Sequence, residues 1–204
     1  MKDVLRKYDA VAERYSAHDY ADAERYYARR ARLVVAHGPP LGAGSSVLDI
    51  ACGDGGLGHH LIALGLDYHG VDASERMVEV GRRELGDRVV HGSFDYVPPG
   101  PVDATTIFRS LYLVPDRRAF LARVRGYTRK KLVFDFDPRA YSTAELLVDV
   151  RAAGWKRIEL RPFLMPQRAR LPRPLQAALW ALEPLPGARA LTRVRFPLLL
   201  SASG

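Results

Sequence analysis

The fold is indicated by one stretch of sequence, VLDIACGDGGLGHHLIALG, at residues 47–65. It opens with a short apolar run, VLDIAC (47–52), which has the length and composition of a buried parallel strand. A glycine-rich loop, GDGGLG (53–58), comes next, and HHLIALG (59–65) has the pattern of a helix closed by glycine. A strand, a glycine loop and a helix in this order predict the first unit of an α/β domain.

Strands and helices are expected to alternate through the rest of the chain. The predicted further strands lie at residues 67–74, 88–94, 102–108, 131–136, 155–163 and 193–203, and the predicted helices at 3–36, 75–86, 116–125 and 143–153. This alternation predicts a doubly wound α/β fold with a mainly parallel sheet. At 204 residues, with no low-complexity linker, we expect a single domain over residues 1–204.

The composition argues against a membrane-spanning or secreted protein. Hydrophobic residues make up 48% of the chain, and the sequence has no apolar run of about 18 residues that would suggest a membrane span. The N-terminal segment has acidic residues and lacks the apolar region of a secretory signal, and a single cysteine cannot form an internal disulfide. These features predict a cytoplasmic protein.

The net charge of +8 is unevenly distributed. Residues 1–116 hold 13 Lys and Arg against 17 Asp and Glu, whereas residues 117–204 hold 18 against 6. A basic half favours anionic partners such as nucleic acid, an acidic substrate or an anionic lipid surface. An Arg-rich surface that simply faces solvent explains the same numbers, so charge alone does not name the partner.

The glycine loop fits two kinds of cofactor. The pattern GxGxxG at residues 53–58, followed by Asp72 19 residues after Gly53, matches the fingerprint of dinucleotide-binding sites. Asp49 argues against a dinucleotide, because a carboxylate beside the loop would repel a pyrophosphate. S-adenosylmethionine has no phosphate and carries an ammonium and a sulfonium, so the acid favours this cofactor over NAD.

Three segments resemble the class I, Rossmann-like S-adenosylmethionine-dependent methyltransferases. They are VLDIACGDGG (47–56), GVDASERMVEVGRR (70–83) and DATTIFRSLYLVPD (103–116). The resemblance implies a Rossmann-like sheet with an antiparallel last strand, and a helical lid over the cofactor formed by residues 3–36. The cofactor-binding residues that it implies are Asp49, Ala51, Gly53, Gly55, Asp72 and Ala73, with Asp72 on the ribose.

Further cofactor contacts are expected at the ends of neighbouring elements. Met77 is a candidate for the adenine through its polarizable thioether, although it could equally be core. Phe94 and Asp95 follow the third strand, where relatives usually carry an Asp and this chain has Ser93. Tyr15 is a candidate lid contact.

The candidate substrate residues are Arg109, Tyr112 and Asp137, which lie at the ends of predicted strands. Arg109 could grip a carboxylate or phosphate, or form a surface ion pair. Tyr112 could donate a hydroxyl or line the core, and Asp137 could face the site or cap a loop. No residue is identified as catalytic. No metal is predicted, since the adjacent His59 and His60 lack metal-ligand spacing.

An inserted segment at about 168–191 separates the last two predicted strands. Leu175, Ala178, Leu179 and Leu182 follow the spacing of one helical face, with Arg residues on both sides. This face could pack on the sheet as core. Alternatively, residues 168–195 could form a substrate lid or a dock for an apolar acceptor or an anionic membrane, with Trp180 at the interface.

The sequence therefore predicts a methyltransferase that acts on a small molecule, acidic or apolar. The acceptor atom and the oligomeric state are not predicted. Two alternatives stay open. The basic half would suit an RNA methyltransferase, although no appended RNA-binding domain is visible. A cofactor-binding module without catalytic activity would keep the same motifs.

Overall fold

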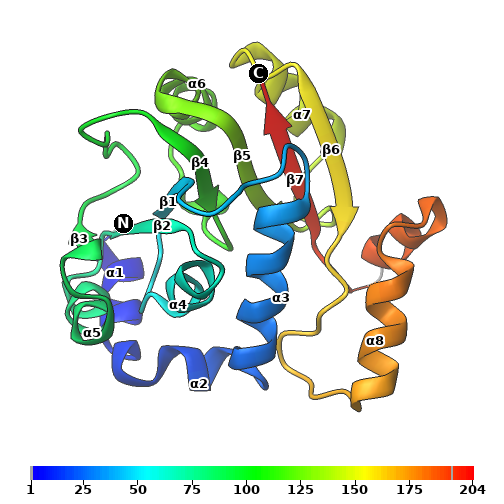
Figure 1. Ribbon diagram of the computed structural model, residues 1–204, viewed down its shortest axis with the longest axis horizontal. Coiled ribbons are helices and arrows are strands. Elements are labelled where there is room, and N and C mark those ends of the chain that lie inside the picture. Colours follow the sequence, from blue (N-terminus) through cyan, green and yellow to red (C-terminus); the bar gives the residue numbers. More distant parts are fainter. Residues whose placement is uncertain (1, 194) are drawn as a thin grey trace.

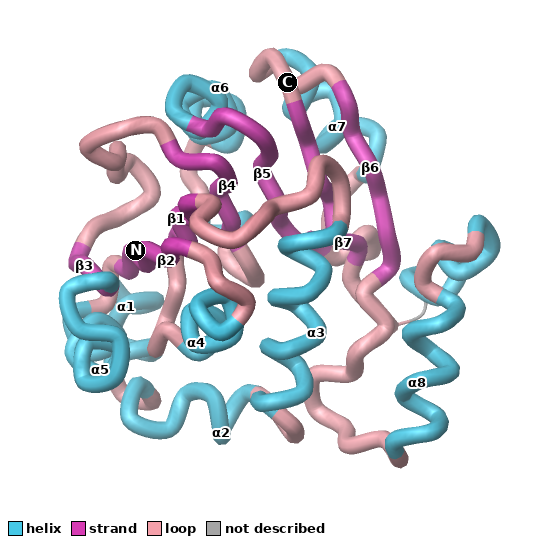
Figure 2. The backbone as a smooth tube through the Cα atoms, viewed as in Figure 1, coloured by secondary structure: helices cyan, strands magenta, loops and turns pink. Residues whose placement is uncertain are grey.

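The fold is described from a computed structural model that covers residues 2–193 and 195–204. One seven-stranded sheet has the order β3-β2-β1-β4-β5-β7-β6 (Figures 1 and 2). The strands are β1 (Ser46–Ile50), β2 (Asp67–Asp72), β3 (Val89–His91), β4 (Val102–Ile107), β5 (Thr128–Phe136), β6 (Arg157–Pro162) and β7 (Leu198–Ser203). The strands β1 to β5 pair in parallel, whereas β7 runs antiparallel to both β5 and β6. The predicted α/β fold with an antiparallel last strand is confirmed.

Helices cover both faces of the sheet. They are α1 (Lys2–Asp9), α2 (Tyr15–Asp19), α3 (Ala23–Ala36), α4 (Gly56–Ala63), α5 (Glu75–Leu85), α6 (Arg117–Tyr127), α7 (Thr143–Ala152) and α8 (Arg173–Leu182). Apolar side chains of α3, α4 and α5 form one core cluster with the sheet, and those of α6 and α7 form a second cluster on the other face. Burial of both faces explains why the parallel strands are nearly continuous apolar runs.

The strand order places the site. From β1 the chain winds outward to β2 and β3, then returns to β4 on the other side of β1. In open α/β sheets a crevice forms at such a reversal, beyond the carboxyl ends of the strands. The loops after β1, β2, β3 and β4 therefore meet at one edge of the sheet.

The N-terminal region differs from the continuous helix predicted for residues 3–36. It is divided into α1, a 3₁₀ turn at Ala12–Arg14, α2 and α3. Tyr20 is extended, and the side chain of Asp22 caps α3 by accepting a hydrogen bond from the Arg25 amide at 3.2 Å. Asp is a strong N-cap residue, so it starts a new helix even though the segment contains no Gly or Pro.

Two element boundaries also differ from expectation. The helix expected to begin at residue 59 begins at Gly56, since Gly55 in the left-handed conformation starts the helical turn. The final strand is shorter than the predicted 193–203 and begins at Leu198. Pro197, which precedes it, has no N–H to donate to the sheet.

Candidate active site

The loop after β1 is shaped by backbone in the left-handed region. Ala51, Gly53 and Gly55 have φ values of 57°, 60° and 78°. This conformation is ordinary for glycine but rare for alanine, and such strain is concentrated at functional sites. Arg109, just after β4, also has a positive φ, of 56°. The two strained non-glycine residues therefore end neighbouring strands at the predicted crevice.

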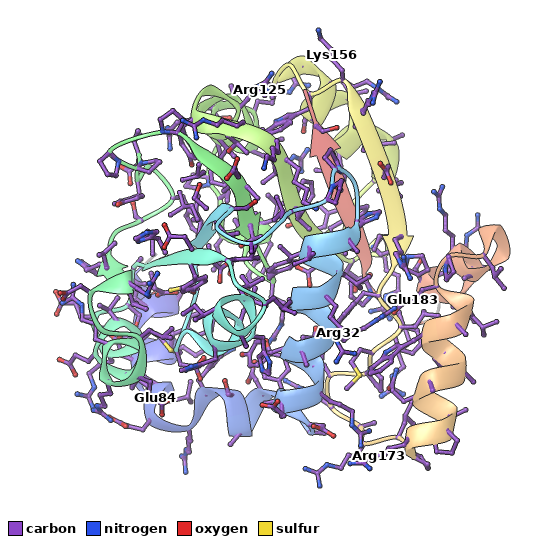
Figure 3. The ribbon with its side chains drawn as sticks, in the orientation of Figure 1. Arg32, Glu84, Arg125, Lys156, Arg173 and Glu183 are labelled. Carbon is purple, nitrogen blue, oxygen red and sulfur yellow. The ribbon has the colours of Figure 1, made fainter. Side chains whose placement is uncertain are left out.

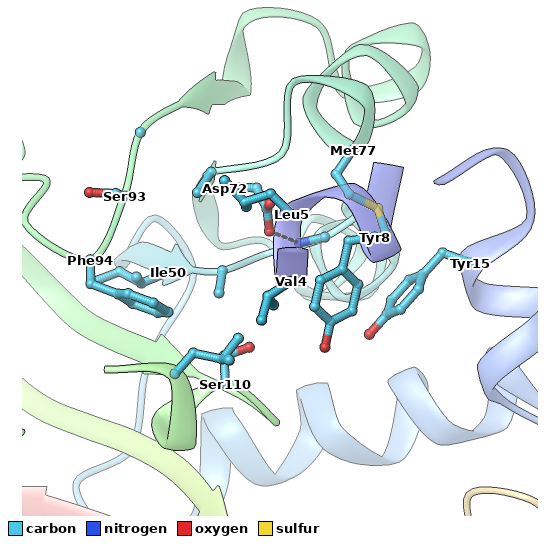
Figure 4. A pocket seen from close by; sticks show the side chains of 15 residues that line it. Val4, Leu5, Tyr8, Tyr15, Ile50, Asp72, Met77, Ser93, Phe94 and Ser110 are labelled. Atoms are coloured by element: carbon cyan, nitrogen blue, oxygen red, sulfur yellow. Dashed lines mark hydrogen bonds between the residues drawn. The ribbon is translucent and has the colours of Figure 1, made fainter. Parts of the chain in front are cut away.

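A first cavity lies in this crevice (Figure 4). Its floor and sides come from the loops after four strands, and the residues are Ile50, Ala51, Gly53, Asp72, Ala73, Met77, Gly92, Ser93, Phe94, Ser110 and Leu113. Val4, Leu5, Tyr8 and Tyr15 cover it from the N-terminal segment. The structure thus brings together seven of the predicted cofactor residues: Ala51, Gly53, Asp72, Ala73, Met77, Phe94 and Tyr15.

Asp72 is the acidic residue that lines this cavity. One carboxylate oxygen accepts a hydrogen bond from the Gly53 amide at 2.8 Å, and the other accepts from the Ser74 amide at 2.9 Å. Burial raises the pKa of Asp72 above its ordinary value, and the backbone hydrogen bonds partly oppose this shift. Each carboxylate oxygen accepts more than one bond. Asp72 is therefore held rigidly at the cavity with acceptor capacity left for hydroxyl groups.

Asp49 lies one layer deeper than the sequence analysis expected. It does not line the cavity; its carboxylate accepts hydrogen bonds from the Thr106 hydroxyl at 2.6 Å and the Tyr68 hydroxyl at 3.3 Å. Burial raises its pKa to about 7. Asp49 and Ile50 are neighbours in β1 and point to opposite faces of the sheet, so Ile50 lines the cavity while Asp49 contacts Thr106 and Tyr68. Asp49 can act on a ligand through its charge, beneath the loop.

Gly55 and Asp95 are not among the residues that line the first cavity. A Cβ on Gly55 would lie 2.7 Å from the Leu85 side chain, so this glycine is needed for packing between the loop and α5. Asp95 is exposed, and its carboxylate accepts a hydrogen bond from the Ser93 hydroxyl instead. A role for either residue in cofactor contact stays a prediction.

The residues of the cavity fit an adenosine-bearing ligand. Ile50, Met77, Phe94 and Leu113 supply apolar walls that suit a flat base, and Asp72 supplies an acceptor pair for ribose hydroxyls. No phosphate-binding cation is among the lining residues. These lining residues therefore suit a nucleoside without phosphates better than a dinucleotide.

Comparison with known proteins agrees with this assignment. Residues 47–131 match the model of a family described as a methyltransferase domain. The ubiquinone biosynthesis O-methyltransferase of Thiobacillus denitrificans is 33% identical over 88 residues, which are 39% of this chain and 38% of that protein. The chain therefore matches well under half of the length of this curated relative.

Solved structures share the whole fold. A TehB-like methyltransferase from Corynebacterium glutamicum aligns over 86% of this chain and 88% of its own, with 21% identity and a TM-score of 0.61. The magnesium protoporphyrin IX methyltransferase of Synechocystis, solved with bound S-adenosylmethionine, aligns over 89% of this chain and 79% of its own, with 16% identity and a TM-score of 0.60.

Residues 47–131 are therefore similar to a methyltransferase-domain family, and the chain as a whole has the fold of S-adenosylmethionine-dependent methyltransferases. Residues from all three motif segments, among them Gly53, Asp72 and Ser110, line the first cavity. The resemblance inferred from the sequence is confirmed, and the dinucleotide interpretation of GxGxxG is not supported.

The N-terminal segment is joined to three of the site loops by polar contacts. The Ser16 hydroxyl donates to Asp54 at 2.5 Å, the Ser74 hydroxyl donates to Asp9 at 2.5 Å, and the Arg109 guanidinium pairs with Asp19 at 3.0 Å. With the segment in this position, only about 50 Å³ of the first cavity is free. Ligand pockets commonly hold about 300–1,000 Å³, so ligand entry requires this segment or its side chains to move.

Arg109 forms contacts within the protein rather than the bidentate contact with a substrate carboxylate or phosphate that was considered from the sequence. Its guanidinium also donates to the Tyr20 hydroxyl at 2.9 Å and approaches the Tyr15 hydroxyl at 3.5 Å. The backbone amide of Arg109 donates to the buried Asp135 at 2.6 Å. Arg109 thus lies in the site but ties the N-terminal segment to the end of β4.

A second cavity, of about 440 Å³, adjoins the first. Ser110 lines both cavities, and the hydroxyls of Tyr8 and Tyr112, one from each cavity, lie 3.1 Å apart. The predicted substrate residues Arg109, Tyr112 and Asp137 all line this second cavity. The Asp137 carboxylate accepts hydrogen bonds from the Arg139 guanidinium, which holds the pKa of Asp137 below its ordinary value. Asp137 is therefore a weak base.

Several site residues were not predicted from the sequence. Val4, Leu5 and Tyr8, from the predicted lid, and Ser110 and Leu113, from the segment 103–116, line the first cavity but were not named as candidates. The apolar and aromatic face of α1 was the available signal, but its position over the cavity depends on the fold. Among the described residues there is no group of three or more side chains that could hold a metal, and no helix is long and apolar enough to cross a membrane.

Proposed function

We propose that this methyltransferase binds S-adenosylmethionine in the first cavity and transfers its methyl group to a small, acidic molecule in the second. The observation that carries the proposal is that two cavities meet at Ser110, one with the family motifs and one with arginines. In the transfer, an acceptor atom attacks the sulfonium methyl, and the broken carbon–sulfur bond leaves its electron pair on sulfur. Placing the two reactants in contact supplies most of the catalysis that such an activated methyl needs.

An acidic acceptor is supported by the lining of the second cavity. Arg168 and Arg195 contribute exposed side chains for which no ion pair is found in the described parts of the chain. Tyr112, Tyr141 and Phe196 add aromatic surface. Arginine binds carboxylates and phosphates in a fork geometry, and aromatic walls suit a planar or apolar body. The volume of about 440 Å³ suits a small molecule rather than a macromolecule.

The acceptor site is tested by replacing two arginines of the same cavity. With phenolic carboxylic acids as acceptors, Arg195→Gln is expected to raise KM roughly tenfold or more, because a charge-assisted bond is lost, and to leave the Kd for S-adenosylmethionine unchanged. Arg109→Gln is expected to weaken the cofactor as well, since it loosens the N-terminal segment. Formation of S-adenosylhomocysteine is the readout. Equal rates for the acids and their neutral amides, in wild type and Arg195→Gln alike, would rule out the acidic acceptor.

Asp49 gives a pH dependence to cofactor binding. The cofactor is a cation, so it binds best when Asp49 is ionised, and its affinity is expected to fall up to about tenfold per pH unit below 7. Calorimetric titration between pH 5.5 and 8.5 measures this, and Asp49→Asn should give a flat profile. A flat profile in the wild type would remove Asp49 from cofactor recognition.

The stability of the free protein should change in the opposite direction. Burial raises the pKa of Asp49 from 3.8 to about 7, so the neutral carboxyl stabilises the fold fully below pH 3.8, and this contribution is lost as the pH rises through 7. Asp49→Asn is therefore expected to be more stable than wild type at pH 8 but not at pH 4. Urea denaturation at both values provides the control for the binding profile.

A further inference from the structure

The inserted helix α8 is attached to the protein by its polar side. Gln176 and Glu183 are 2% and 1% exposed, and Trp180 lies between them on the same face. The Gln176 side-chain amide donates to the Leu164 carbonyl at 2.8 Å, and the Trp180 ring packs against Arg29 of α3 at 5.0 Å. Trp180 therefore faces the protein, not an external interface as considered from the sequence.

Glu183 fixes the end of this helix. Its carboxylate pairs with Arg29 and, at 3.3 Å, with Arg161, and it accepts the Leu164 amide at 3.0 Å. Figure 3 shows Glu183 where α8 approaches the body of the molecule and Arg173 at the far end of the helix. The charge of Glu183 is thus neutralised inside the fold and does not reach the surface.

The apolar side of α8 faces outward. Leu175 and Leu182, from the face predicted in the sequence, are 50% and 41% exposed, and Ala178 is exposed too. Leu185, in the turn after α8, and Leu191, in the 3₁₀ segment Pro186–Arg193 that follows, are also exposed. The interpretation of this face as core is therefore wrong. Gln176, Trp180 and Glu183 hold the helix, so Leu175 and Leu182 stay exposed, while Leu179 of the predicted face is half-buried.

Arginines surround these leucines. Exposed guanidinium groups come from Arg170, Arg173, Arg189 and Arg193. Glu183 is the only acidic residue between positions 160 and 204, and it is buried. Arg170 approaches Asp22 at 3.8 Å, whereas no ion pair is found for Arg173, Arg189 and Arg193 in the described parts of the chain. The surface formed by Leu175, Leu182, Leu185, Leu191 and the four arginines, here called the α8 surface, therefore combines apolar side chains with an excess of positive charge. Figure 1 shows α8 at one edge of the molecule, beyond α3 and β6.

We propose that the α8 surface binds an anionic membrane surface. An amphipathic helix that lies in a membrane interface needs an apolar face and basic flanks, and the α8 surface supplies both. A second copy of this chain, docked through the same surface, would bring like charges together. A nucleic acid would use the arginines but not the leucines. An anionic bilayer uses both, by taking leucine side chains between its lipids and arginines against its headgroups.

Vesicle co-sedimentation with the full chain tests the proposal. Binding is compared for vesicles of phosphatidylcholine alone and of phosphatidylcholine with phosphatidylglycerol. The apolar variant is Leu175→Ser with Leu182→Ser. Its control is Leu64→Ser with Val148→Ser, which are 43% and 54% exposed and lie at the end of α4 and in α7. The charge variant is Arg173→Gln with Arg193→Gln, and its control removes the exposed Arg129 and Arg151 in the same way.

The expected result is binding to the anionic vesicles only. The charge variant should bind roughly 25-fold more weakly, from about 1 kcal/mol for each arginine. The apolar variant should lose about tenfold or more at unchanged thermal stability, and both controls should bind like wild type. No binding to anionic vesicles would overturn the proposal, and so would binding that the leucine changes leave intact. Binding to single-stranded RNA with equal affinity in the apolar variant, without vesicle binding, would assign the surface to nucleic acid instead.

Discussion

Asp135→Asn is expected to lower the free energy of unfolding by about 3–5 kcal/mol, because it leaves the buried charge of Arg30 without its counter-ion. The two side chains are 5% and 3% exposed and form an ion pair at 2.8 Å beneath the site. Asp135 also accepts the amide of Arg109, so the pair supports the strained residue at the end of β4. Urea denaturation provides the measurement.

A double-mutant cycle separates the pair from its surroundings. Arg30→Met alone should also destabilise, whereas the double variant Arg30→Met with Asp135→Asn should recover much of the loss, since neither charge is then left unpaired. Asp137→Asn is the control, as its ion pair with Arg139 is half-exposed and should contribute less than about 1 kcal/mol. Strictly additive losses in the cycle would mean that the two side chains do not stabilise each other.

Asp72→Asn is expected to weaken S-adenosylmethionine binding roughly 10- to 150-fold. This range corresponds to the roughly 1.5–3 kcal/mol of hydrogen bonds to a charged group. The asparagine keeps one acceptor for the loop amides, so the fold should survive the change. Asp67→Asn, at the other end of β2 and paired with Arg88 on the surface, should not affect the Kd. An unchanged Kd in a folded Asp72→Asn protein would exclude Asp72 as the ribose acid.

The sheet could be predicted from the sequence because its signals are local. Short apolar runs, glycines after strands and helix caps such as Ser142 are read directly from neighbouring residues, and the structure confirms them. The breaks in the N-terminal helices were missed. Asp22 is a cap signal, but the extended Tyr20 that precedes it carries no sequence mark.

The cofactor side of the site was more predictable than the acceptor side. Gly53, Asp72 and Met77 follow strands at fixed spacing, so the order of the chain places them. Arg109 could be placed at the edge of the sheet, but its pairing with Asp19 depends on where α2 lies. The outward face of α8 was not predictable either, because burial of Glu183 by Arg29 and Arg161 reverses the usual orientation of such a helix.

The most direct test of the central claim is a calorimetric titration of the purified protein with S-adenosylmethionine and, separately, with NAD. We expect S-adenosylmethionine to bind with one site per chain and a Kd in the micromolar range, because Asp72, the glycine loop and the apolar walls form one cavity that suits a nucleoside without phosphates. NAD should give no binding heat, since the carboxylates of Asp49 and Asp72 beside the loop disfavour its pyrophosphate and no cation lines the cavity to offset them. Tight binding of NAD together with no binding of S-adenosylmethionine would contradict the account.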